Sequence, residues 1–165
     1  AARFVLLLLF YLFTVNEIKS VMWVILPAGA QVLFQSAIVI LQVVSQRSLG
    51  LITLGELKLD PLQAGTSVII TDGIRFLRGY GLSDHPNILG GCLAFGLILM
   101  LSVTLYGKRR EPVLASIIFL ITFLALVMTF SRSAWLSFFV AGSFMVGVDT
   151  FLRRWDSIKR AAIRA

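Results

Sequence analysis

Three arginines are the residues best suited to chemistry in this sequence. Arg75 and Arg78 are three residues apart and would share one face of a helical turn. Arg132 lies in Ser131–Ser133, a short connection between two apolar runs. A guanidinium presents a planar fork of N–H donors that suits phosphate and diphosphate groups. These arginines therefore indicate a site for a phosphorylated ligand.

Each arginine also has an interpretation without a ligand. Arg75 has Asp72 close by in the sequence, and Arg78 has Asp84, so both could form ordinary ion pairs within a loop. Arg132 could extend its side chain to lipid phosphate at a membrane surface. The residue types alone leave both interpretations open.

Polar residues beside the arginines are the next candidates. His85 suits a general base near neutral pH or a structural hydrogen-bond donor, and Asn87 suits a ligand hydroxyl or a helix cap. Asp84 is the expected cap of a helix that Pro86 opens. A glutamine stripe lies within about 60° on one helix face and predicts either interhelical hydrogen bonds or the wall of a polar groove. Its members are Gln31, Gln35, Gln42 and Gln46.

Composition dictates the elements that must position these residues. The chain is 58% hydrophobic with a mean hydropathy of +0.93, and the apolar residues form long runs nearly free of charge. Runs of that kind are typical of membrane-spanning helices, in which the backbone satisfies its own hydrogen bonds. A single cysteine, Cys92, and a single histidine argue against a transition-metal site, and we expect no metal and no cofactor.

The predicted fold is all-α: one polytopic transmembrane bundle over residues 1–165, with one truncated and four complete spans. Residues 4–15 are too short to cross about 30 Å of hydrocarbon, so we expect a span cut from a longer chain. A signal peptide is the alternative. The complete spans are expected at 21–44, 88–106, 113–130 and 134–152, with a loop at 45–87 and a basic tail at 153–165.

Lysine and arginine clusters set the expected topology. They occur in residues 108–110 and 153–164, an even number of spans apart, so both are expected in the cytoplasm. The 45–87 loop and residues 131–133 then face outward. The net charge of +7 follows from this topology and from contact with membrane lipids, and it does not predict nucleic-acid binding.

Two strings together resemble a known family. They are RGYGLSDHPNILG at 78–90 and TFSRSAWL at 129–136. In this order, and on the same predicted face, they resemble the O-antigen ligase and O-antigen polymerase superfamily of bacterial membrane glycosyltransferases. The resemblance covers roughly residues 75–152.

The resemblance implies a GT-C-like, metal-independent glycosyltransferase in the bacterial plasma (inner) membrane, with its active face periplasmic. Such an enzyme moves a glycan from a polyprenyl diphosphate carrier, such as undecaprenyl diphosphate, to an acceptor saccharide or lipid during the synthesis of surface polysaccharide such as lipopolysaccharide. It implies catalytic roles for Arg132 and Arg78. The residues expected to bind substrate are Arg75, Asn87, His85, Gln35 and Gln42. The family's catalytic base lies in a segment beyond this stretch, so the chain alone is expected to be inactive.

Two other functions remain open at this stage. A transporter or flippase-like protein would line a path for an anionic or lipid-linked substrate with the glutamine stripe and the outer arginines. A non-catalytic assembly subunit would tolerate the loss of Arg132. The sequence does not distinguish a ligase from a polymerase, and it identifies neither the sugar nor the oligomeric state.

Overall fold

The computed structural model describes residues 2–17, 20–108 and 110–164, with side chains described except at 2, 3, 10 and beyond 153. Most of this chain is helical, as predicted. The elements in order are α1 (Ala2–Glu17), α2 (Met22–Ser45), a 3-10 turn η1 (Ile52–Leu54), β1 (Val68–Thr71), β2 (Ile74–Leu77), α3 (Pro86–Tyr106), α4 (Glu111–Met128) and α5 (Arg132–Arg164).

Four helices in the described ranges are long and apolar enough to cross a membrane. They are Met22–Ser45, Pro86–Tyr106, Glu111–Met128 and the Arg132–Arg153 part of α5. Their apolar side chains face outward as well as inward, and Trp23, Phe95 and Phe144 are each more than two-thirds exposed. A helix that is apolar on all sides is typical of a lipid environment. The predicted membrane-helix architecture is confirmed at this level.

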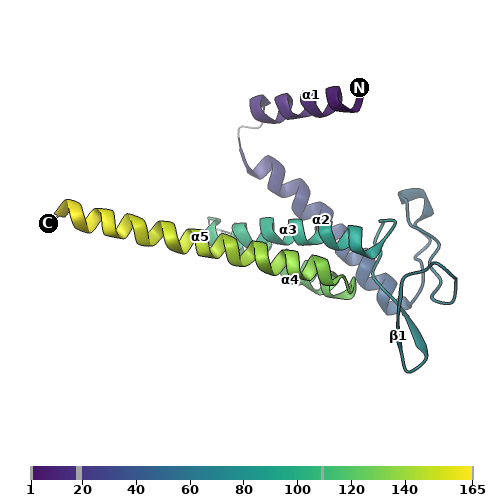
Figure 1. The fold of residues 1–165 in the computed structure, drawn as a ribbon. Coiled ribbons are helices and arrows are strands. Elements are labelled where there is room, and N and C mark those ends of the chain that lie inside the picture. Colours follow the sequence, from purple (N-terminus) through teal and green to yellow (C-terminus); the bar gives the residue numbers. More distant parts are fainter. Residues whose placement is uncertain (1, 18–19, 109, 165) are drawn as a thin grey trace.

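The four helices pack into one bundle, in which α3 lies against α2, α4 and α5, and α2 also lies against α4 (Figure 1). Its buried centre contains Val32, Leu93, Leu97 and Leu126. Gly96 allows α2 and α3 to approach closely, because a Cβ at this position would collide with the side chain of Val32. Small residues at such crossings are typical of membrane helix packing.

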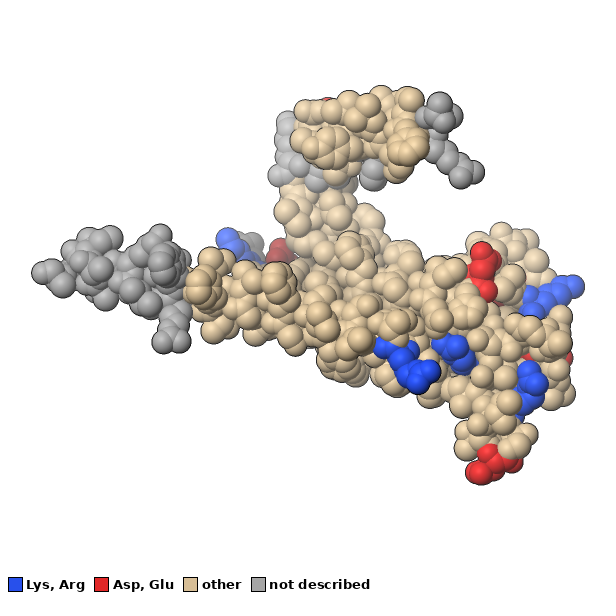
Figure 2. Space-filling model, in the orientation of Figure 1, with Lys and Arg blue, Asp and Glu red and all other residues tan. Residues whose placement is uncertain are grey.

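One end of the bundle carries almost all of the irregular structure (Figure 1). The C-terminal end of α2, the start of α3 and the α4–α5 connection meet there, together with the loop between α2 and α3. We call this the loop end. A two-stranded antiparallel hairpin projects from it, with Val68 paired to Leu77 and Thr71 paired to Ile74. In Figure 2 most of the visible charged atoms lie at this end, while uncharged atoms cover the visible helical region.

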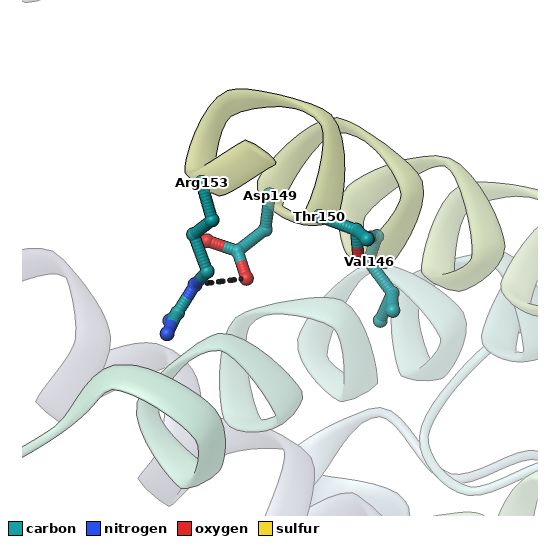
Figure 3. A network of polar contacts seen from close by, with 4 residues as sticks. All are labelled: Val146, Asp149, Thr150 and Arg153. Carbon is teal, nitrogen blue, oxygen red and sulfur yellow. Dashed lines mark hydrogen bonds and ion pairs between the residues drawn. The ribbon is translucent and has the colours of Figure 1, made fainter. Parts of the chain in front are cut away.

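Helix α1 lies apart from the bundle and contacts none of the other described helices (Figure 1). Helix α5 is one continuous helix of 33 residues, so it does not end where the predicted basic tail begins. Near the end of its apolar part, Asp149 and Arg153 form an ion pair with an Nε–Oδ2 distance of 2.8 Å (Figure 3). The Arg153 side chain is 70% exposed, so this pair contributes little to stability.

Candidate functional site

Arg78 is the main cross-link of the loop end. Its Nε donates to the carbonyl of Thr129 at 2.8 Å, and its Nη2 donates to the carbonyl of Phe130 at 3.2 Å. Nη2 also donates to Oδ1 of Asn87 at 2.8 Å, and Nη1 donates to Oγ of Ser67 at 3.1 Å. One half-buried guanidinium thus joins the hairpin, the first turn of α3 and the α4–α5 connection.

Arg78 keeps its positive charge at the junction that it cross-links. Burial lowers the pKa of the guanidinium, and the nearby Tyr80 opposes that shift. Arginine stays charged in proteins at neutral pH, so Arg78 places a fixed positive charge at this junction. The ion pair with Asp84 that the sequence suggested is not formed in the described part of the chain.

Arg132 has the opposite environment. It is the first residue of α5, and its side chain is exposed. No described residue gives it a hydrogen bond or an ion pair. Arg78 binds the carbonyl of Phe130, and Arg132 is only two residues further along the chain. The structure therefore brings the two arginines to one junction, with one bound by protein groups and the other left available.

Arg75 does not share a helical face with Arg78. Arg75 lies in β2 and Arg78 directly follows the last residue of that strand, so the two do not share a helical turn. Nε of Arg75 donates to the carbonyl of Pro61 at 2.6 Å, within the loop between α2 and α3. An ion pair with Asp72 is also absent from the described residues. The predicted helical turn is wrong here, because the hairpin depends on cross-strand pairing rather than on local spacing.

His85 and Asn87 open α3. His85, not Asp84, is the N-cap: its Nδ1 accepts the backbone N–H of Asn87 at 3.1 Å, and Pro86 follows at the first helical position. Asn87 uses its side-chain oxygen to hold Arg78. In the neutral ring, an accepting Nδ1 leaves the proton on Nε2. His85 is thereby arranged as a donor through Nε2 and not as a base.

The glutamine stripe binds the loop and not a neighbouring helix. Gln42 is fully buried, and its amide forms a two-way pair with Gly81, accepting from the N–H at 2.8 Å and donating to the carbonyl at 2.9 Å. Oε1 of Gln35 accepts the N–H of Leu82, and Oε1 of Gln46 accepts the N–H of Leu77. The fourth member, Gln31, is exposed. Three of the glutamines therefore bind the segment that runs from the end of β2 towards α3.

Glu56 completes this network and was not singled out from the sequence. Its Oε1 accepts from Nε2 of Gln42 at 2.8 Å and from the N–H of Leu49 at 2.7 Å, while Oε2 accepts the N–H of Leu51 at 2.6 Å. The residue is only 4% exposed. Burial alone would raise the pKa of Glu56, but these hydrogen bonds outweigh it and lower the pKa below the ordinary value of 4.5.

Two further residues with structural roles escaped sequence reasoning. Ser67 binds Arg78, and its backbone N–H donates to the hydroxyl of the buried Tyr80. For these two residues the sequence offers no local signal. For Glu56 a signal exists, since it is the lone charged residue in the apolar stretch 49–57.

Searches of protein-family models, curated proteins and solved structures find no match to this chain.

Proposed function

We propose that this chain is part of a membrane glycosyltransferase of the O-antigen ligase or polymerase type. Such an enzyme transfers a glycan from a polyprenyl diphosphate to an acceptor in the bacterial plasma membrane, on the outer face. The observation that carries the proposal is the pairing at the α4–α5 connection, where Arg78 fixes the backbone and the adjacent Arg132 is exposed, with no side-chain partner among the described residues.

The transfer reaction needs one cation at the leaving group and a second group that holds that cation in position. The acceptor hydroxyl oxygen attacks the anomeric carbon, the bond between that carbon and the diphosphate oxygen breaks, and the electron pair leaves with the diphosphate. A cation held ready at the leaving group stabilises the charge that develops. Arg132 is suited to that contact, because no described residue accepts a hydrogen bond from its guanidinium. Arg78 is a positioning residue in this scheme, because four of its five N–H donors are already used by protein groups.

The acceptor proton goes to a base, for which the resemblance points to a segment beyond this chain. His85 is not assigned that role, since its Nδ1 already accepts the cap hydrogen bond.

The position of the basic residues supports an outward-facing loop end. Lys108 and Arg110 flank the start of α4, and Arg153 lies far along α5, so these three are at the opposite end of the bundle. The positive-inside rule weighs short connections most, so the basic 108–110 turn favours a cytoplasmic position for that end and supports an outward position for the loop end, whose basic residues lie mainly in the long 45–87 loop. The transporter alternative gains no support, because Gln35 and Gln42 bind the loop backbone rather than line an open path.

The test uses the full-length gene in a strain that lacks it, with surface glycan and accumulated polyprenyl-linked precursor measured at matched protein levels. We expect Arg132→Ala and Arg132→Lys to lose the glycan and accumulate precursor, because lysine cannot form the planar two-donor contact. Arg47→Ala is the matched control, since Arg47 is also an exposed arginine at the loop end with no hydrogen-bond or ion-pair partner among described residues. Wild-type behaviour of both Arg132 variants would make Arg132 a lipid anchor and overturn the proposal.

A further inference from the structure

A polar cavity of about 300 Å³ opens on the loop end, away from the transmembrane helices. Two stretches of the loop, 57–59 and 63–66, form one side of it. Tyr80, Asp84 and His85, from the segment that leads into α3, form the other side. Its volume is at the lower limit of ordinary ligand pockets, about 300–1,000 Å³, and suits one ring-sized polar molecule.

The cavity brings together polar groups that the protein itself leaves unused. Lys58, Gln63 and Asp84 line it, and none of the three side chains has a hydrogen bond or an ion pair within the described residues. They offer an ammonium donor, an amide that both donates and accepts, and a carboxylate acceptor. One positive and one negative charge oppose each other, so the lining does not select a strongly charged ligand.

His85 adds a donor of defined chemistry. Because Nδ1 accepts the N–H of Asn87, the neutral ring carries its proton on Nε2. Tyr80 packs edge-on against this ring, with 6.4 Å between centroids, and is 3% exposed, so it forms a fixed wall. A small volume lined by both donors and acceptors matches a polyol, whose hydroxyl groups both donate and accept.

The cavity adjoins the arginine junction through two segments of the chain. Thr66 lines it, and the next residue, Ser67, accepts a hydrogen bond from Arg78. His85 lines it and caps Asn87, whose side chain also accepts from Arg78. A ring held in the cavity would therefore lie beside the group that positions Arg132.

We propose that this cavity binds one neutral sugar ring of the glycan substrate. The identification of that ring as part of a transferase substrate rests on the proposed function, whereas the sugar binding itself rests on Lys58, Gln63, Asp84 and His85. In this proposal the cavity selects the sugar, and its residues take no part in forming or breaking bonds.

The experiment uses the full-length protein in lipid nanodiscs, without sugar-based detergent, and saturation-transfer NMR. The probes are the methyl glycosides of glucose, galactose and N-acetylglucosamine, with methyl glucuronide as the charged comparison. We expect at least one neutral glycoside to bind. Asp84→Ala and Gln63→Ala should each weaken that binding by about tenfold, which corresponds to the loss of one hydrogen bond to the ligand.

Asp72→Asn is the matched control. It removes one negative charge from the same loop, at the hairpin tip, where asparagine tolerates the positive φ of 52°. Binding should be unchanged in this variant. The proposal is overturned if no neutral glycoside binds, if binding survives both cavity variants, or if only the glucuronide binds and Lys58→Ala abolishes it.

The two proposals fail separately. If glycosides bind in the cavity while the Arg132 variants retain transfer, the sugar site stands and the role of Arg132 is lost. If the Arg132 variants lose transfer while the cavity variants bind and transfer normally, the transferase proposal stands and the sugar site is lost.

Discussion

The two ends of the helical bundle are built on different principles. At the loop end, the side chains of Gln42 and Glu56 bind backbone groups of the loop between α2 and α3, and both are buried. The side chain of Arg78 binds carbonyls of the α4–α5 connection. At the opposite end, α3 and α4 are joined by a short turn, in which Oε2 of Glu111 accepts the N–H of Lys108 at 3.1 Å. The loop end is thus held in place by side-chain hydrogen bonds, whereas the α3–α4 turn serves to reverse the chain direction.

The difference matters because buried polar side chains are costly unless they are fully bonded. A connection that served only to join two helices would need none of them. Fixing the 46–85 segment in this way keeps Arg132, the cavity lining and the start of α3 in a constant relation. This is the preorganisation that a binding or catalytic surface needs.

The largest expected effect comes from removing the cross-link that distinguishes the loop end. Arg78→Ala deletes four hydrogen bonds and should lower the free energy of unfolding by about 2–4 kcal/mol. Hydrogen exchange measured by mass spectrometry should speed up in the hairpin and at the α4–α5 connection. Arg78→Lys should recover little, because an ammonium cannot reach four acceptors in one plane. Unchanged exchange in both variants would show that the loop end is held by other contacts.

A smaller effect is expected from acid. The folded-state pKa of Glu56 lies below the ordinary 4.5, so its stabilising contribution is present above that value and is lost as the pH falls through the folded-state pKa. Thermal unfolding of wild type should therefore shift to lower temperature below about pH 4.5 more steeply than unfolding of Glu56→Gln. Parallel pH profiles of the two proteins would remove Glu56 from the network.

The smallest effect at the loop end is expected from Arg75→Ala. Only one hydrogen bond, to the carbonyl of Pro61, is lost, so the free energy of unfolding should fall by less than about 1 kcal/mol. Transfer activity should stay near wild type, because the hydrogen bond of this side chain is to Pro61 and not to the α4–α5 connection. Lys108→Ala, at the opposite end, is the control for a basic residue outside the network. A loss of activity as large as that of the Arg132 variants would place Arg75 in the site after all.

The helices could be predicted because their signal is local. Long apolar runs identify α2, α3 and α4 without any knowledge of their partners, and Pro86 marks the start of α3. The glutamine stripe could likewise be recognised by its spacing, although its partner could not. That partner, the segment around Gly81, lies 39 residues from Gln42 and reaches it only through the folded loop.

The hairpin and the roles of the arginines could not be predicted, for a related reason. Residues 68–77 pair across a turn at Asp72 and Gly73, both with positive φ, and no periodic pattern distinguishes this from a helical turn. Arg78 and Arg132 looked equivalent as charged residues beside apolar runs. They differ only because the carbonyls of Thr129 and Phe130, more than 50 residues from Arg78, accept its hydrogen bonds.

Helix α5 connects the loop end with the opposite side of the bundle through one continuous helix. Its 33 residues rise by about 50 Å as one rod, which exceeds the roughly 30 Å thickness of a bilayer core. Arg132 is the first residue of that rod, and the helix continues without a break past the Asp149–Arg153 pair. A rotation of this helix about its axis would therefore also turn the backbone from which the Arg132 side chain extends.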